Sequence, residues 1–407
     1  MPAPVPRLMI PGPTELAPEV LEALAQPAVA HYGEEWWAEH DDTMRMLAQV
    51  FETEAEPLLI VGAGTAGLEA GAATLLPPGE RVAVGVNGAF GERLVALMET
   101  LGFVVVPIEA PWGEGITREH LSRGLDDAGP VSLVAIVHGE TSTGVLNPMA
   151  ELAEEARVRG ALVLVDAIAS FGGVRLPVDE WGIDICVGAP QKCLGAVPGV
   201  CPVAVSDRAW RRMEETVASS PRPGWCLNLL QWRRYASERA LWEPYPTTMP
   251  CALVRALQAA LRKLLEEGME NRYSRLETLA RAFREGVRAL GCRTVAQEQW
   301  ASPTVTAVLL PPGVCGLRAR AFLRDEADCL VGFGAAPYRD RGFRVGHFGA
   351  AADPEAHAQL LRGLGRYLRQ AGVEVDEEAG VRAAEAVLDT GSVGIGIPTY
   401  EVPDETQ

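Results

Sequence analysis

The sequence predicts an α/β fold built on a mainly parallel sheet with helices on both faces. Short apolar runs alternate along the first half of the chain with segments of helical periodicity, and these runs lack alternating polar positions. Such runs are typical of strands buried on both faces, which is how parallel sheets pack. Two of the runs lead to residues of chemical interest, Asp166 and Lys192. We therefore expect a large α/β domain whose ligands bind beyond the carboxyl ends of its strands.

The elements of the large domain follow from periodicity and from candidate caps. Apolar residues between Met46 and Phe51 recur at the spacing of one buried helix face. Thr14 can cap a short helix over 18–24, and Thr117 can cap the helix that follows it. Uninterrupted apolar stretches predict strands at 57–62, 81–86, 104–110, 131–137, 161–166, 183–187 and 200–206.

A smaller α/β domain is expected from about residue 255. Leucine-rich helical stripes are followed by the alternating strand 304–310 and by a helix that starts after Asp353. The segment 208–250 has many Trp, Arg and Pro residues with little periodicity, so we expect connecting and interface structure there. The expected divisions are an N-terminal arm, a large domain, a small domain, and a docked helix with a loose tail, at 1–20, 21–254, 255–375 and 376–407.

Composition limits the class of ligand. The formal net charge is −18, and such a surface attracts neither the phosphates of nucleic acid nor an anionic membrane. No apolar stretch is long enough to span a bilayer, and the first residues lack the apolar core of a signal peptide. The eight cysteines form no CxxC pairs and have no histidines at metal-binding spacing. We expect small-molecule ligands, no metal, and reduced cysteines in a cytoplasmic protein.

The strongest chemical signal is the pair of Asp166 and Lys192. The run 161–165 ends on Asp166, and a second apolar run, 183–187, leads into a turn that contains Lys192. A desolvated lysine has a lowered pKa, which makes its amine a nucleophile able to form a Schiff base. A buried aspartate at the same sheet edge needs a cationic partner, and a protonated pyridine nitrogen is one. Together they predict pyridoxal 5′-phosphate as the cofactor.

A glycine-rich turn at 62–67 has the spacing G-x-G-x-x-G. A dinucleotide-binding fold would have an acidic residue at the end of the next strand, but that strand ends in Asn87 and Gly88. A nucleotide-binding oxidoreductase is therefore the weaker interpretation. Backbone N–H groups at the start of a helix bind any phosphate, including that of pyridoxal phosphate.

Four motifs occur in order over residues 8 to 372: HGETSTG (138–144), VDAIASFGG (165–173), Gln191–Lys192 and FRVGHFG (343–349). They resemble the motifs of class V aminotransferases of fold type I, most closely those of the alanine–glyoxylate and serine–pyruvate group. The resemblance implies a large domain with a mainly parallel seven-stranded sheet and a small C-terminal α/β domain. It also implies transfer of an amino group from a small amino acid, such as alanine or serine, to glyoxylate or pyruvate.

The resemblance assigns roles to individual residues. Lys192 holds the cofactor, Asp166 binds its pyridine nitrogen, and Arg344 binds the substrate carboxylate. Many relatives carry serine where this chain has Ala63, a loss that Thr65 and Gln191 can offset. The remaining implied contacts are Gly64, Phe90 and Thr141 with the cofactor, and Gly12 and Tyr32 with the substrate.

The segment YPTTMP (245–250) is similar to a family motif in which a tyrosine and a threonine reach the cofactor phosphate of the partner subunit. Carried over to this chain, these residues are Tyr245 and Thr248, which implies a homodimer. Pro246 and Thr247 stand where relatives usually have histidines, so the loop departs from the family pattern.

Three alternatives remain open. The segments 191–199, 301–308 and 381–389 are similar to pyridoxamine–pyruvate aminotransferase, but Thr65 and Tyr245 restore a phosphate cup that such an enzyme does not need. A cysteine desulfurase or another class V lyase would need a mobile catalytic cysteine, and no cysteine lies in a recognisable desulfurase motif. A binding protein that has kept the fold without activity is disfavoured, because the candidate lysine and aspartate are both present.

Overall fold

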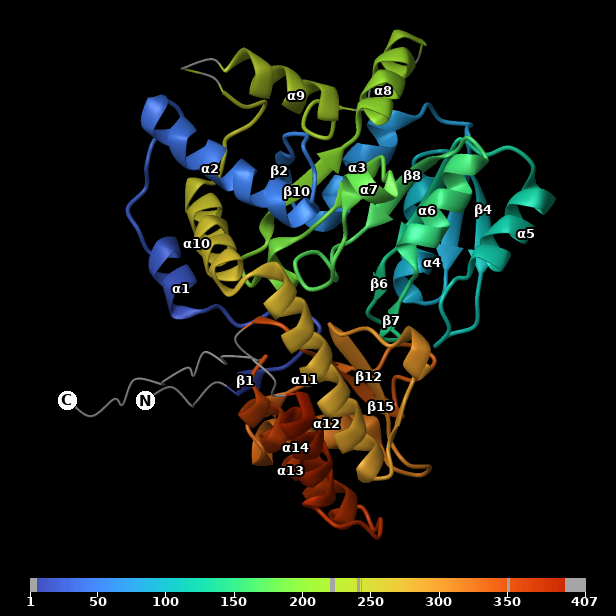
Figure 1. Ribbon diagram of the computed structural model, residues 1–407, viewed down its shortest axis with the longest axis vertical. Helices are drawn as coiled ribbons and strands as arrows, with labels where there is room; N and C mark the ends of the chain where they lie inside the picture. The colour runs from blue at the N-terminus through green and yellow to red at the C-terminus, as the bar shows by residue number, and fades with distance from the viewer. Residues whose placement is uncertain (1–5, 220–223, 240–241, 243, 350–351, 392–407) are drawn as a thin grey trace.

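A seven-stranded sheet forms the centre of the larger domain (Figure 1). The computed structural model describes residues 6–219, 224–239, 242, 244–349 and 352–391. The strand order is β2 (Leu58–Gly62), β10 (Gly199–Val205), β9 (Ile185–Val187), β8 (Leu162–Asp166), β5 (Leu133–Val137), β3 (Arg81–Val86) and β4 (Val104–Glu109). Only β10 is antiparallel to its neighbours in this sheet. The predicted α/β class and mainly parallel sheet are therefore confirmed.

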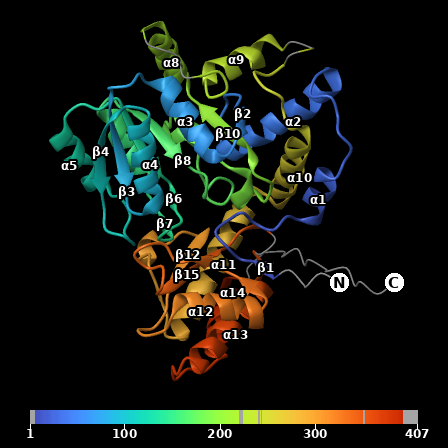
Figure 2. The ribbon, with the colours of Figure 1, turned by 180° about the vertical axis from the view of Figure 1, so that it is seen from behind.

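Helices cover both faces of this sheet. They are α1 (Pro18–Leu24), α2 (Glu34–Phe51), α3 (Gly64–Leu75), α4 (Ala89–Thr100), α5 (Arg118–Ala128), α6 (Met149–Val158), α7 (Val178–Trp181), α8 (Asp207–Ser219), α9 (Leu229–Glu238) and α10 (Cys251–Glu267). Helix α6 lies in front of the sheet in Figure 1, whereas α3 and α4 lie in front of it in Figure 2. Every residue of β5 and β8 is buried, which explains their unbroken apolar sequences. No helix of the described part of the chain is both long and apolar enough to cross a membrane.

The smaller domain packs helices against a four-stranded antiparallel sheet. The strand order is β11 (Arg293–Thr294), β12 (Val305–Leu309), β15 (Gly342–Gly346) and β14 (Gly332–Phe333). The helices are α11 (Met269–Ala289), α12 (Gly316–Glu326), α13 (Pro354–Gln370) and α14 (Ala379–Gly391). One hydrophobic core consists of buried residues up to Leu264. A second core consists mainly of buried residues from Ala282 to Ala384. The boundary expected near residue 255 stays a prediction, and the tail 392–407 lies outside the described residues.

The N-terminal arm connects the two domains. Strand β1 (Arg7–Leu8) pairs in parallel with β13 (Cys329–Leu330) of the small domain. Met9 O then accepts a hydrogen bond of 3.0 Å from Gly346 N, at the end of β15. Beyond this point the arm passes into the large domain, where α1 packs against α10. The arm therefore lies beside the strand that carries Arg344.

The two predicted N-caps have different outcomes. Thr117 accepts a hydrogen bond from His120 N and completes a capping box at the start of α5, as predicted. The prediction for Thr14 is wrong, because its hydroxyl donates to Phe348 O at 3.1 Å and Ala17 stands at the N-cap of α1. A buried hydroxyl needs a partner, and the small domain provides one that the local sequence does not show.

The segment 208–250 is more regular than its sequence predicts. It contains most of α8 and all of α9. The buried positions of α8 include Ala209, Trp210, Met213 and Thr216, which share one face of the helix. Arginine and glutamate residues at the intervening positions hide this short apolar stripe, so the absence of clear periodicity was misleading.

Candidate active site

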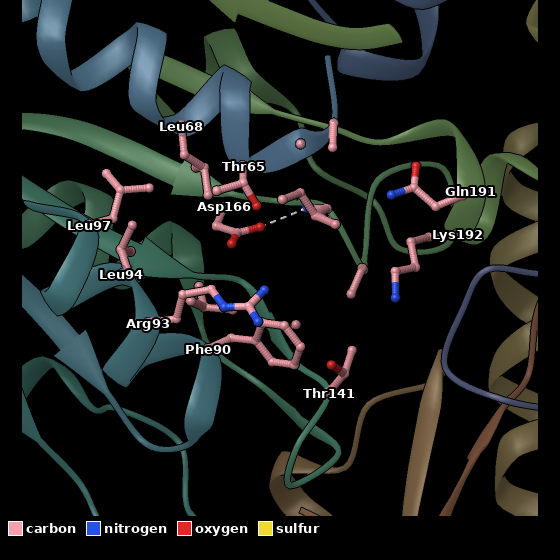
Figure 3. Close-up of a pocket in the computed structure, with 16 residues that line it drawn as sticks. Thr65, Leu68, Phe90, Arg93, Leu94, Leu97, Thr141, Asp166, Gln191 and Lys192 are labelled. Atoms are coloured by element: carbon pink, nitrogen blue, oxygen red, sulfur yellow. Dashed lines mark hydrogen bonds between the residues drawn. The ribbon is translucent and has the colours of Figure 1, made fainter. Parts of the chain in front are cut away.

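A cavity of about 270 Å³ lies beyond the carboxyl ends of the parallel strands (Figure 3). The predicted residues that line it are Ala63, Gly64, Thr65, Phe90, Thr141, Asp166, Gln191 and Lys192. In Figure 3, Asp166 and Lys192 project into it from opposite sides. Parallel pairing explains this convergence, because it brings the ends of strands that are distant in sequence to one edge of the sheet.

Lys192 lies in a turn, Pro190–Leu194, that follows β9, and its backbone angles (φ −119°, ψ −126°) are not helical. Burial lowers the pKa of its amine to about 8. Its Nζ donates a hydrogen bond to Pro11 O of the arm. A Cβ added to Gly12 would lie 2.5 Å from Cδ of the lysine. Gly12, expected near the substrate, therefore lies directly against Lys192.

Asp166 ends β8 and is buried between β5 and β9. Burial raises the pKa of its carboxyl to about 6, and the charge of Glu140 adds to this effect. Oδ1 accepts one hydrogen bond, of 3.0 Å, from Ile168 N. Within the described residues Asp166 forms no salt bridge. A cation that entered the cavity would therefore meet a carboxylate with spare hydrogen-bonding capacity.

The turn between β2 and α3 presents backbone N–H groups to the cavity. Ala63 occupies the N-cap of α3 and makes no side-chain hydrogen bond, so the cap leaves donors of the first turn open. Ala63 and Thr65 are exposed at the edge of the cavity. Nearby, the buried Oε1 of Gln191 has no hydrogen-bond partner among the described residues. Open donors at a helix start are suited to a phosphate.

Arg344 lies on β15 of the small domain and reaches the large domain. Its Nε donates to Phe333 O at 2.7 Å, and its Nη1 donates to Thr141 O at 3.1 Å. Both acceptors are neutral carbonyl groups, and the part of the chain that the structure describes gives Arg344 no salt bridge. Burial lowers the pKa of its guanidinium. Because Thr141 lines the cavity, this arginine is held at the cavity margin, where the charge of Glu140 partly opposes the effect of burial on its pKa.

The other three predicted residues do not line the cavity of their own chain. Tyr32 is half exposed and packs edge-on against His31. Tyr245 is buried, and its hydroxyl accepts a hydrogen bond of 2.9 Å from Trp36 Nε1. Thr248 is exposed on the surface. Their predicted contacts with substrate or with a partner's cofactor therefore stay predictions.

Sequence reasoning missed two residues next to this cavity. Arg93 lines it, with its guanidinium 5.3 Å from the centroid of the Phe90 ring. The spacing of three residues on one helix was a usable signal for this pair. Glu140 is fully buried within the HGETSTG motif, and an acidic residue in a buried segment was a signal too. Two of its four hydrogen-bond donors, however, lie in α4 and not in the motif.

Known proteins share this architecture. Residues 10–326 match the family model for aminotransferase class V. The chain belongs to the class V aminotransferase family. A solved ureidoglycine–glyoxylate aminotransferase from Bacillus subtilis matches this class V aminotransferase with a TM-score of 0.90 and 30% identity, over 96% of this chain and 99% of its own.

Two further solved structures are similar. An alanine–glyoxylate aminotransferase from Nostoc sp. has a TM-score of 0.85 and 33% identity, over 91% of this chain and 97% of its own. A pyridoxamine–pyruvate aminotransferase from Mesorhizobium loti has a TM-score of 0.90 and 29% identity, over 96% of this chain and 99% of its own. The predicted family, fold type I and class of enzyme, a pyridoxal-phosphate-dependent aminotransferase, are confirmed.

Proposed function

We propose that this class V aminotransferase binds pyridoxal 5′-phosphate in the cavity and transfers an amino group from a small amino acid to glyoxylate or pyruvate. Alanine and serine are the proposed donors. The observation that carries the proposal is that Lys192 and Asp166 line one cavity. Arg344 donates a hydrogen bond to Thr141, which also lines this cavity. Similarity to two glyoxylate aminotransferases supports the proposed acceptor.

The cavity residues fit this cofactor at both ends. The unpartnered Gln191 side chain and the open start of α3 suit a phosphate. Asp166, which forms no salt bridge in the described chain, suits a protonated ring nitrogen, and Phe90 offers a flat surface to the ring. Bound there, pyridoxal phosphate supplies an aldehyde that bonds to amines and a ring that accepts electrons from the substrate Cα.

Lys192 is the proposed nucleophile and proton carrier. With a pKa near 8, an appreciable fraction of its amine is uncharged at neutral pH and has a lone pair available. When its amine is free and uncharged, Nζ would take the proton from the substrate Cα. Pro11 O accepts a hydrogen bond from Nζ and keeps the released amine inside the cavity.

Asp166 and Arg344 act at the two sides of the reacting carbon. An ion pair with the ring nitrogen favours ionised Asp166 and keeps that nitrogen protonated. The planar guanidinium of Arg344 matches the substrate carboxylate and fixes the amino acid so that its Cα hydrogen points towards Lys192. Thr141, whose carbonyl oxygen accepts a hydrogen bond from Arg344, lines the cavity in which we propose that the cofactor binds.

The proposed active unit is a homodimer in which Tyr245 and Thr248 reach the cofactor phosphate of the partner subunit. Ala63 and Thr65 are exposed in the single chain, which leaves the phosphate end of the cavity uncovered. Trp225, whose Nε1 donates a hydrogen bond to Pro246 O, is also 52% exposed, as suits an aromatic residue that is buried in an interface.

A cytoplasmic location, suggested by cysteine usage, remains part of this proposal; the eight cysteines are free thiols.

A pyridoxamine–pyruvate aminotransferase is the second candidate. It is favoured by the similarity to a solved enzyme of that name and by Ala63, which lacks the hydroxyl that many relatives carry. Thr65 and Gln191 count against it, since both offer polar groups to a phosphate. A desulfurase has less support, because burial raises the pKa of Cys329 to about 12 and a nucleophilic cysteine must be a thiolate.

The test is the visible absorbance of purified protein supplied with pyridoxal phosphate. We expect the band of a lysine-bound cofactor, and L-alanine without a 2-oxo acid should convert it to the pyridoxamine phosphate form. A band that L-alanine and L-serine leave unchanged, in protein that converts free pyridoxamine and pyruvate, would overturn the first candidate in favour of the second. Absence of any band would overturn both.

A further inference from the structure

Glu140 is a buried acid at the wall of the cavity with no role in the proposed chemistry. It belongs to β6 (Gly139–Glu140), which pairs with β7 (Val145–Leu146), and it is fully buried. Its neighbours Gly139 and Thr141 both line the cavity. Within the described residues Glu140 forms no salt bridge. Burying an unpaired carboxylate is costly, so its hydrogen bonds must account for its presence.

Both carboxylate oxygens of Glu140 are fully engaged. Oε2 accepts hydrogen bonds from Phe90 N at 3.0 Å and from Gly91 N at 3.1 Å. Oε1 accepts from Ser142 N at 2.9 Å and from Ser142 Oγ at 2.5 Å. The same Ser142 hydroxyl accepts a hydrogen bond of 2.9 Å from Ala89 N. Glu140 and Ser142 therefore satisfy the first three N–H groups of α4.

Helix α4 has no cap of its own. Gly88 stands at its N-cap and has no side chain to accept these hydrogen bonds. A Cβ at Gly88 would lie 2.5 Å from Cδ of Glu140 and 2.4 Å from Oγ of Ser142, so the two segments are in close contact. A negative charge at a helix start also interacts favourably with the helix dipole. The cap of α4 thus comes from residues about fifty positions later in the chain.

The capped turn carries residues of the proposed site. Phe90 is the second residue of α4, and its ring forms one wall of the cavity. Thr141, the residue after Glu140, accepts a hydrogen bond from Arg344 with its backbone carbonyl oxygen. One side chain therefore joins the wall for the cofactor ring to the segment that holds the substrate arginine.

We propose that Glu140 is a positioning residue that, by capping α4, fixes the Phe90 ring against the cofactor and keeps Thr141 in place to hold Arg344. This inference rests on the proposed function for the roles of Phe90 and Arg344. The capping itself rests only on hydrogen bonds within the chain, so it is testable without cofactor or substrate.

The first test is hydrogen exchange of the cofactor-free protein. In Glu140→Gln the side-chain NH₂ cannot accept a hydrogen bond, so either the α4 donors or Ser142 lose a partner. If the NH₂ group faces α4, exchange of the Phe90 and Gly91 amides should accelerate by about tenfold or more; if it faces Ser142, exchange of the Ser142 amide should accelerate instead. The matched control is Glu92→Gln, which removes an exposed carboxylate from the same helical turn and should change exchange by less than about twofold. Unchanged exchange of the Phe90, Gly91 and Ser142 amides in Glu140→Gln would overturn the proposal.

A milder variant guards against a failure to fold. Ser142→Ala removes the acceptor of Ala89 N and leaves the Glu140 carboxylate in place. Its Ala89 amide should exchange about threefold to tenfold faster, while the Phe90 and Gly91 amides keep most of their protection. Equal protection of all three amides in Ser142→Ala and in the unaltered protein would contradict the assignment.

The second test uses protein loaded with pyridoxal phosphate. In Glu140→Gln the visible circular dichroism per bound cofactor should weaken, because the ring loses its fixed neighbour, and kcat should fall by about tenfold. Glu140→Asp should not restore either property, because its carboxyl group falls short by about 1.5 Å. If the unaltered protein binds no cofactor, the proposed function fails while the exchange result still decides the capping. If it transaminates and Glu140→Gln keeps an unaltered dichroism signal, the positioning role alone fails.

Discussion

Asp166 and Glu140 are two buried carboxylates near the same edge of the sheet, and they differ in how well they are hydrogen bonded. Glu140 accepts four hydrogen bonds from α4 and Ser142, whereas Asp166 accepts one from Ile168 N. Burial raises the pKa of both groups. We propose that the saturated carboxylate has a structural role and that the unsaturated one binds a ligand. Unfilled hydrogen-bonding capacity, more than burial, is what sets the proposed binding residue apart.

The largest effect is expected when Lys192, which lines the same cavity as Asp166, is removed. Lys192→Ala should lower transamination by at least about 10³-fold, because the nucleophile and the proton carrier are lost together. Far-UV circular dichroism should stay unchanged. Lys263, which pairs with Glu19 on the surface, is the sole other lysine in the sequence. Lys263→Ala is therefore the control and should keep full activity. An active Lys192→Ala protein would contradict the proposed mechanism.

The next largest effect is expected at Asp166 itself. Asp166→Asn should lower kcat by about 10²-fold to 10³-fold, because a neutral amide no longer keeps the ring nitrogen protonated. The control is Asp184→Asn, a buried aspartate that pairs with Arg208 and accepts hydrogen bonds from Val163 N and Ser206 Oγ. That change should reduce thermal stability rather than kcat. Similar kcat losses in both variants would show that unfilled hydrogen-bonding capacity does not set Asp166 apart from Asp184.

Arg344 extends the comparison to a cation whose hydrogen bonds reach only neutral groups. Arg344→Lys should raise KM for the amino acid by about tenfold to a hundredfold, because lysine cannot contact Phe333 O and Thr141 O and still offer two donors to a carboxylate. The effect on kcat should be smaller. Steady-state kinetics with L-alanine and glyoxylate measure both constants, and an unchanged KM would exclude Arg344 from carboxylate binding.

The smallest effect sharpens the comparison most directly. The Lys192 amine of cofactor-free protein should titrate near pH 8, and Asp166→Asn should lower this midpoint, because the Asp166 charge favours the protonated amine. Glu140→Gln should leave the midpoint nearly unchanged. With two lysines in the sequence, ¹⁵N-lysine NMR resolves the titration, and Lys192→Ala identifies the signal. A larger shift in Glu140→Gln than in Asp166→Asn would reverse the roles assigned to the two acids.

The sequence by itself determined the parts of the site that depend on one element each. Asp166 follows its own buried strand, Lys192 follows the next, and the glycine-rich turn opens its own helix. Period and polarity along a short segment are enough to predict such placements, because a parallel sheet brings all its strand ends to one edge. The family motifs then predicted the residue roles that periodicity cannot supply.

Only the tertiary structure decided which distant groups became partners. The acceptor of Thr14 lies 334 positions away, and the Arg344 contact with Thr141 spans 203. Two of the donors to Glu140 belong to α4, about fifty positions earlier in the chain, and the buried stripe of α8 is recognisable once its neighbours are known. Local sequence encodes how much of each element is buried. Which polar groups meet inside depends on how the elements pack, and a buried polar group takes the partner that packing provides.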